Sequence, residues 1–224
     1  MTPVIALAVV LGYLGGSVSF PYWIARFYGV DLRSVGSRKL GGSNLGRSVG
    51  LVPGIVGGTL DGAKGLAAIL ASGAAGLPLE AQLACGIAAT CGQLWPAFHG
   101  FDGGRANATG WGFALATDQI AFLIMMVPVV AAVALRLTVR PRPSRIVPLA
   151  NLLSFAVFPT VIVEQLGPSP VAIAGYTVLV LVIVRRVTAG LGADLATGAP
   201  VGRVIANRVL YDRSELQERG VVGI

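Results

Sequence analysis

The sequence has few charged residues. Asp, Glu, Lys and Arg make up 12% of its 224 residues, against about 25% in an ordinary soluble domain. A water-soluble globule cannot cover its surface with so few charges, and a coiled coil or a disordered chain would carry more of them. Hydrophobic residues reach 54%, and the mean hydropathy is +0.77. The composition therefore indicates an integral membrane protein.

Cysteine and histidine are scarce as well, with two Cys and one His. Cys85 and Cys91 lie in one apolar stretch, a position typical of small buried thiols rather than of a disulfide. With His99 alone and no clustered carboxylates, no metal site is predicted. Neither a Walker A spacing nor a GxGxxG after a strand is present, so nucleotide binding is not indicated and no cofactor is expected. The basic residues are not interleaved with aromatic ones, which argues against a nucleic-acid partner.

Six apolar runs are close to the roughly 20 residues that a helix needs to cross a bilayer. They are residues 3–25, 51–75, 80–98, 119–135, 146–163 and 170–184. The first run lacks the basic start of a secretory signal, so it is expected to be retained as a span. The sequence therefore predicts an all-α membrane bundle.

The placement of Lys and Arg predicts the orientation of this bundle, because these residues concentrate on the cytoplasmic side. They are frequent in residues 26–47 and absent from the turn at 76–80. Residues 136–145, which hold four arginines, fall on the same side only if the short stretch 106–117 also crosses or half-crosses the membrane. About seven transmembrane elements result, with the N-terminus outside and the C-terminus cytoplasmic. We expect a membrane domain over residues 1–186 and a polar cytoplasmic tail over 187–224.

The short element 106–117 is too short to span the hydrocarbon core unaided. Broken backbone at that depth is tolerated where protein or a wet cavity satisfies its polar groups. We therefore expect this element to line the functional cavity. The alternative is a re-entrant kink without chemistry.

A first glycine-rich segment, residues 29–50, has the composition of a phosphate site. Glycines let backbone N–H groups approach an anion, hydroxyl and amide side chains add neutral donors, and basic residues add charge. These residues are Gly36, Gly41, Gly42, Gly46, Ser37, Ser43, Asn44, Arg38, Lys39 and Arg47. The alternative is a flexible basic loop that meets anionic lipid head groups.

A second glycine-rich segment, residues 101–110, opens the short element. It contains Gly103, Gly104 and Arg105 just before a predicted helix start near Asn107 or Thr109. The free N–H groups of a first helical turn attract anions. Two such segments on one side of the membrane suggest a reaction in which both substrates carry phosphate.

The ionisable residues Asp61 and Lys64 lie three positions apart inside the second apolar run. This spacing puts them on one helical face, where they can form an ion pair. An ionisable pair inside a membrane is either functional or a structural brace, and the sequence leaves both open. His99, in the loop after the third run, is either a base or a solvated residue.

Several of these motifs together resemble the PlsY family, the bacterial membrane glycerol-3-phosphate acyltransferases that use acyl phosphate. The resemblance covers residues 11–118 well. It is carried by Gly16-Ser17-Val18-Ser19-Phe20, Asp31-Leu32-Arg33, Gly36-Ser37, Asn44, Arg47, Gly50, Asp61, Lys64, Gly65, Phe101-Asp102-Gly103-Gly104-Arg105, Ala108-Thr109 and Gly112. It implies seven membrane elements in the bacterial inner membrane, with the N-terminus outside and an active site open to the cytoplasm. It also implies transfer of a fatty acyl group from acyl phosphate to the 1-hydroxyl of glycerol 3-phosphate, giving lysophosphatidic acid and phosphate.

The resemblance also implies roles for particular residues. The catalytic set it implies is Ser37, Arg47 and Arg105, and the phosphate-binding set is Lys39, Gly41, Ser43, Asn44, Gly103, Gly104, Thr109, Ser144 and Arg186. The sequence departs from the family at Arg105, which replaces a lysine, and at Gln93, which replaces a histidine. In the last motif, Arg186 and Ala189 replace a histidine and an asparagine, so charge is kept while proton transfer is lost.

Two other classes of function remain open alongside the acyltransferase. The first is a diverged homologue that binds phosphorylated lipid or polyol phosphate without turnover, which the sequence cannot separate from the enzyme. The second is a small-solute transporter, which would show internal repeats or paired broken helices. The sequence shows no such repeat, and membrane lipid, acyl phosphate and glycerol 3-phosphate are the expected partners.

Overall fold

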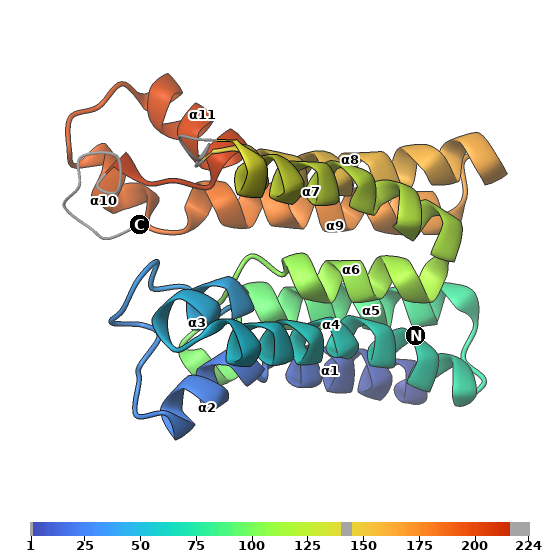
Figure 1. Cartoon of the computed structure of the whole chain (residues 1–224). Coiled ribbons are helices and arrows are strands. Elements are labelled where there is room, and N and C mark those ends of the chain that lie inside the picture. Colours follow the sequence, from blue (N-terminus) through green and yellow to red (C-terminus); the bar gives the residue numbers. More distant parts are fainter. Residues whose placement is uncertain (1, 140–144, 216–224) are drawn as a thin grey trace. The chain divides into compact units, whose positions relative to one another are not determined.

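All regular secondary structure in the described part of the chain is helical, as the sequence predicts. The structure is a computed structural model that describes residues 2–139 and 145–215 (Figure 1). The helices are α1 (Pro3–Ser17), α2 (Phe20–Phe27), α3 (Gly42–Ser48), α4 (Leu51–Ala74), α5 (Leu79–Leu94), the 3-10 turn η1 (Ala97–His99), α6 (Asn107–Thr117), α7 (Gln119–Thr138), α8 (Ile146–Leu166), α9 (Pro170–Thr188), α10 (Leu191–Leu195) and α11 (Val201–Tyr211).

Five stretches within the described residues are long and apolar enough to cross a membrane. They are Pro3–Phe27, Leu51–Ala74, Gln119–Thr138, Ile146–Leu166 and Pro170–Thr188. The helices α5 and α6, with 16 and 11 residues, are shorter. The number of membrane elements and the orientation derived from the Lys and Arg residues stay predictions.

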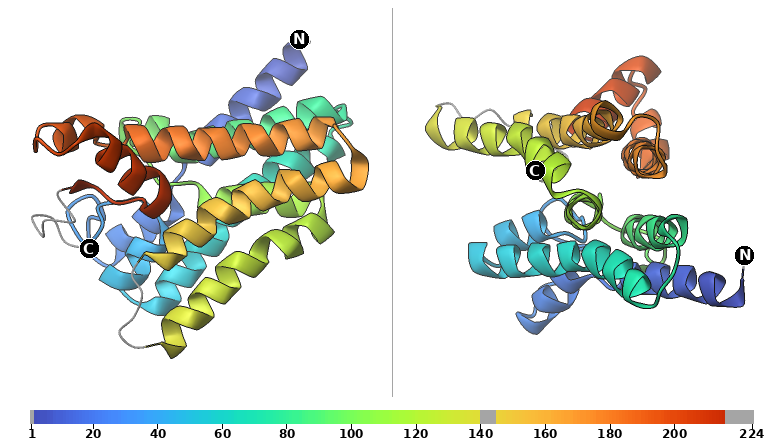
Figure 2. Two further views of the ribbon diagram at one scale, coloured as in Figure 1. Left: turned by 90° about the horizontal axis from the view of Figure 1, so that it is seen from above. Right: turned by 90° about the vertical axis from the view of Figure 1, so that its right-hand side faces the viewer.

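The helices form two compact units, Met1–Asp118 and Gln119–Ile224. In the first unit, α5 packs against α1, α4 and α6, and α3 packs against α4. In the second unit, α8 lies between α7 and α9, as both views of Figure 2 show. The helix α11 packs against α8 and α9. The predicted boundary between residues 186 and 187 falls inside the second unit and stays a prediction.

The first apolar run is not one continuous helix. It is broken at Val18, where α1 ends, and α2 begins after Ser19. The Ser19 hydroxyl accepts a hydrogen bond from the Tyr22 amide at 3.3 Å, and Pro21 lies in the first turn. A serine cap followed by proline is a typical helix start. The motif Ser19-Phe20-Pro21 therefore explains locally why a new helix begins here.

Glycines set the close approach of helices in the first unit. A Cβ atom at Gly112 on α6 would overlap the carbonyl oxygen of Gly62 on α4, and one at Gly65 would overlap Thr109 O. Between α1 and α5, a Cβ at Gly16 or Gly92 would overlap the facing backbone. Small residues at helix interfaces allow this contact in membrane proteins.

We expect Gly112→Ala to destabilise the protein, because the new methyl group has to push α6 away from α4. Overpacking of this kind costs roughly 1–3 kcal/mol. Gly15→Ala on α1 is the matched control, since a Cβ there meets no atom within 4 Å. Thermal unfolding in detergent measures both changes. Equal midpoints for the two variants would contradict the packing argument.

Candidate functional site

The first glycine-rich segment is folded around Asn44, which lies on α3 and is 0% exposed. Its Nδ2 donates to the carbonyl oxygens of Leu32 (3.2 Å), Val35 (3.2 Å) and Lys39 (3.1 Å), and its Oδ1 accepts from the Ser37 amide at 3.0 Å. The sequence analysis placed Asn44 among the phosphate ligands. In the structure its amide is occupied by the loop's own backbone, so Asn44 shapes the segment.

The chain needs a glycine at position 36 to turn around Asn44. Gly36 has a φ of +54°, and a Cβ there would overlap Asn44 Oδ1. The next residue, Ser37, carries a hydroxyl oxygen that is buried and has no hydrogen-bond partner in the described part of the chain. A buried polar atom without a partner costs about 1–3 kcal/mol. Ser37 Oγ is therefore the atom of this segment most suited to meet a ligand.

The first glycine-rich segment contains Arg38, Lys39 and Arg47 as basic residues. Arg33, in the same segment, is paired with Asp31, at 2.7 Å between Nη2 and Oδ2 and 3.0 Å between Nε and Oδ1. Hydrogen bonds from Arg33 lower the pKa of Asp31 to about 2, so this pair stays ionised. Arg47 is exposed on α3, where its Nε donates to the Ser43 carbonyl at 3.2 Å. Ser43 is exposed and Gly41 is half-buried beside it.

The two glycine-rich segments, which the sequence analysis placed on one side of the membrane, contact each other in the structure. Gly103 and Gly104 are buried, and a Cβ built on Gly104 would lie 3.0 Å from the carbonyl oxygen of Leu40 in the first segment. The Gly104 amide donates to the Gln93 carbonyl at 3.1 Å. Any side chain at position 103 would overlap Gln93 O and Pro96. Gly103 is therefore required by its packing against the end of α5 and Pro96, and Gly104 by its contact with the first segment.

Arg105 follows these glycines and is half-buried at the start of α6. Ala106 precedes the helix with a φ of +52°, and no side chain caps the first turn. The N–H groups of that turn carry the positive end of the helix dipole. Thr109 is buried, and its hydroxyl donates to the Asp61 carbonyl at 2.9 Å, so its contact is with α4.

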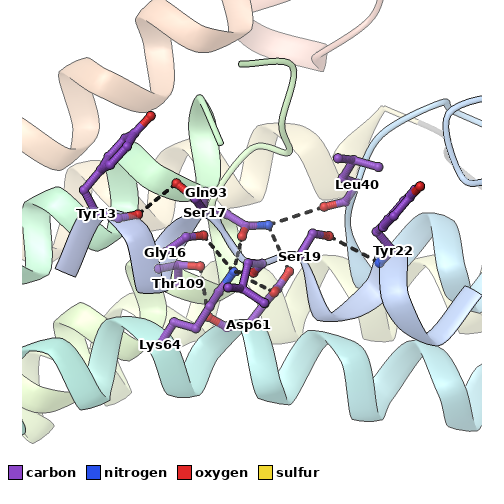
Figure 3. A network of polar contacts seen from close by, with 11 residues as sticks. Tyr13, Gly16, Ser17, Ser19, Tyr22, Leu40, Asp61, Lys64, Gln93 and Thr109 are labelled. Atoms are coloured by element: carbon purple, nitrogen blue, oxygen red, sulfur yellow. Dashed lines mark hydrogen bonds and ion pairs between the residues drawn. The ribbon is translucent and has the colours of Figure 1, made fainter. Parts of the chain in front are cut away.

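Asp61 and Lys64 form the ion pair that their spacing predicts, at 2.8 Å between Oδ1 and Nζ. Lys64 Nζ also donates to the carbonyl oxygens of Gly16 (3.0 Å) and Val18 and to Gln93 Oε1 (Figure 3). A helix break inside a membrane leaves carbonyls without helical partners, and such groups must be satisfied by the protein. Lys64 therefore satisfies the carbonyls that the break between α1 and α2 leaves without helical partners.

His99 lies in η1 and packs edge-on against Tyr22, with ring centroids 4.7 Å apart. The guanidinium of Arg33 lies 5.1 Å from the centroid of the same Tyr22 ring. Partial burial, and then the charges of Arg33 and Lys64, lower the pKa of His99. The imidazole is therefore neutral at neutral pH.

Arg186, one of the residues assigned to phosphate binding, lies near the end of α9 and is 1% exposed. It donates to the carbonyl oxygens of Val209 on α11 (2.8 Å) and Pro148 on α8 (3.0 Å). Arg208 on α11 binds Asp194 at 2.7 Å and the carbonyls of Gly190 and Ala189 after α9. Arg208 therefore satisfies carbonyls at the C-terminal end of α9, and Arg186 joins α9 to α8 and to the last turn of α11. Ser144, the remaining assigned residue, lies outside the described residues.

Sequence reasoning missed the contacts of Gln93 and Arg208. For Gln93 a signal existed, since an amide inside the apolar run 80–98 has to find polar partners. Arg208 and Asp194 lie 14 residues apart in a polar stretch, and no spacing or motif in the sequence predicts their ion pair. Gln93 is therefore a buried polar residue that contacts both glycine-rich segments.

Comparison with known proteins identifies the family. The family model described as glycerol-3-phosphate acyltransferase matches residues 6–190. Glycerol-3-phosphate acyltransferase of Synechococcus sp. (strain CC9902) is 33% identical over 181 residues, which cover 80% of this chain and 86% of that protein. Glycerol-3-phosphate acyltransferase 1 of Deinococcus radiodurans is 37% identical over 131 residues, 58% of this chain and 66% of that protein. The chain therefore belongs to the glycerol-3-phosphate acyltransferase family.

A solved structure supports the same assignment. The crystal structure of PlsY, an integral membrane glycerol 3-phosphate acyltransferase, in its glycerol 3-phosphate form is similar to this chain with a TM-score of 0.73 and 27% identity. The match covers 87% of this chain and 93% of PlsY. The lysophosphatidic acid form matches with a TM-score of 0.71. Together with the five apolar stretches, this confirms the predicted all-α integral membrane fold.

The curated relatives differ in how much of their length is matched. The matched part spans 66% of the Deinococcus radiodurans protein and 55% of a Leptospira borgpetersenii relative that is 40% identical. The resemblance noted in the sequence is confirmed at the level of the family. Fold and family do not by themselves assign a reaction, which has to be argued from the site.

Proposed function

We propose that this protein transfers a fatty acyl group from acyl phosphate to the 1-hydroxyl of glycerol 3-phosphate. The observation that carries the proposal is the contact between the two glycine-rich segments at Leu40 and Gly104. Each segment offers donors suited to a phosphate group, and both substrates of this reaction carry one. The names of the relatives and of the PlsY forms with glycerol 3-phosphate and lysophosphatidic acid support the same substrate and product.

The reaction needs little covalent chemistry from the protein. The oxygen of the 1-hydroxyl bonds to the acyl carbon, the bond from that carbon to the phosphate oxygen breaks, and inorganic phosphate leaves. A phosphate group, with a second pKa of about 6, can take the proton of the hydroxyl near neutral pH. Positioning and charge stabilisation can then supply most of the rate.

The proposal gives roles to individual residues. Ser37 Oγ, buried and without a protein partner in the described residues, donates to a substrate oxygen. Arg47 and Arg105 stabilise the charge that develops on the acyl and phosphate oxygens. Lys39, Gly41 and Ser43 line one phosphate position, and the second segment provides the other. Within the second segment, Gly103 and Gly104 are buried and shape the backbone that carries Arg105.

The orientation of the protein belongs to the same proposal. The Lys and Arg residues of both segments favour an active site that opens to the cytoplasm, with the N-terminus outside. The membrane would then be the bacterial inner membrane, where lysophosphatidic acid enters the cytoplasmic leaflet.

An assay of the purified protein in lipid nanodiscs tests the reaction. We expect labelled glycerol 3-phosphate and acyl phosphate to give lysophosphatidic acid and inorganic phosphate in equal amounts. Acyl coenzyme A in place of acyl phosphate is the control for the donor, and it should give no product. If acyl phosphate gave lysophosphatidic acid only at the background level while the protein still bound glycerol 3-phosphate, the result would favour the non-catalytic binding protein instead.

A further inference from the structure

Gln93 lies where four parts of the first unit come together. It belongs to the last turn of α5 and is 4% exposed. Its side chain reaches α4 and the first glycine-rich segment (Figure 3). Its backbone carbonyl reaches the second segment. Gln93 has no role in the proposed reaction, and because it is uncharged it does not contribute to the charge pattern of the sequence.

The amide of Gln93 can adopt only one orientation in these surroundings. Its Oε1 accepts from the Lys64 ammonium, and its Nε2 donates to Asp61 Oδ2 at 2.9 Å. Turning the amide over would set its NH₂ group against the ammonium and its oxygen against the carboxylate, both of which are repulsive. The buried ion pair therefore fixes the direction in which the other N–H group of Nε2 points.

This other N–H group donates to the carbonyl oxygen of Leu40, at 3.3 Å. Leu40 is the residue of the first glycine-rich segment that lies against Gly104. Gly104 in turn donates its amide hydrogen to the Gln93 carbonyl at 3.1 Å. One residue thus holds the first segment by its side chain and the second segment by its backbone.

We infer that Gln93 is a positioning residue that sets the separation of the two glycine-rich segments. This inference rests on the proposed function in one respect. The separation matters only if each segment holds the phosphate of one substrate. A reaction between two held groups is sensitive to their distance, and a displacement of about 1 Å can cost about 100-fold in rate. Gln93 touches neither substrate and acts through Leu40 and Gly104.

The test replaces Gln93 by Met, which keeps the length of the side chain and removes its hydrogen bonds. Gln82→Met is the matched control, because Gln82 lies on the same helix and its side chain donates to the nearby Leu77 carbonyl at 2.7 Å, away from both glycine-rich segments. We expect Gln93→Met to raise the KM of both substrates about tenfold and to lower kcat, while Gln82→Met changes neither. A residue with a merely structural role would reduce the amount of active enzyme and leave both KM values unchanged.

A second measurement does not depend on activity. Spin labels on Arg38→Cys and Asp102→Cys, both exposed positions, report the distance between the segments by pulsed electron resonance in nanodiscs. The background carries Cys85→Ala and Cys91→Ala. We expect Gln93→Met, but not Gln82→Met, to broaden or shift this distance distribution.

The two readouts separate the inference from the proposed function. Unchanged distances in Gln93→Met, or an increase in only one KM, would overturn the positioning role even in an active enzyme. A wild-type protein without transferase activity would contradict the proposed function. In that case a broadened distance in Gln93→Met would still support the positioning of the segments.

Discussion

Replacing Arg105 by Ala should lower kcat/KM for acyl transfer about 100-fold, the size of effect seen when one charge-stabilising donor is removed from an active site. Arg105 stands between the buried glycines of the second segment and the uncapped first turn of α6. Alanine removes both its charge and its hydrogen-bond donors, while the backbone of the segment is kept. The measurement is the initial rate of lysophosphatidic acid formation at several concentrations of each substrate.

Arg105→Lys separates charge from geometry at the same position. Lysine is the residue that the PlsY family resemblance places here, so we expect Arg105→Lys to retain or raise activity. A loss as deep as that of Arg105→Ala would show that the site needs the forked donors of a guanidinium. Arg26→Ala, an exposed arginine in the last turn of α2, is the control and should keep wild-type rates. Wild-type kcat/KM in Arg105→Ala would contradict the proposed role of this residue.

Replacing Lys64 by Met should destabilise the protein by roughly 3–5 kcal/mol, because it leaves the Asp61 carboxylate buried without its cation. The side chains of Asp61 and Lys64 are only 4% and 6% exposed, so water cannot take the place of the ammonium. The carbonyls of Gly16 and Val18 lose a donor in the same change. Thermal unfolding in detergent should show a midpoint lower by roughly 10 °C.

Two further variants test the cause of this loss. Asp61→Asn combined with Lys64→Met removes the uncompensated charge, so the double variant should recover part of the lost midpoint. It should not recover all of it, because the break between α1 and α2 still lacks the ammonium. Glu80→Gln, which removes an exposed charge in the first turn of α5, is the control and should unfold with the wild type. An unchanged midpoint in Lys64→Met would show that the pair does not brace the bundle.

The apolar runs and the glycine-rich segments were predictable from the sequence, and the helices fall close to the expected ranges. The run predicted at 119–135 is α7, Gln119–Thr138, and the short element predicted at 106–117 is α6, Asn107–Thr117. The family also followed from the sequence, because its motifs are contiguous and ordered along residues 11–118. The roles of Asn44 and Thr109 did not follow, since an amide or hydroxyl in such a motif can bind either a ligand or the protein's own backbone.

The sequence by itself determined that the chain is a helical membrane protein with two basic, glycine-rich segments. Hydropathy and charge are sums over neighbouring residues, so they can be read along the chain. Only the tertiary structure decided that Lys64 closes the break after α1 and that Gln93 joins the two segments. These contacts link residues 29 to 53 positions apart. Their hydrogen bonds depend on how closely the glycine-containing faces of α1, α4, α5 and α6 pack, which no local pattern specifies.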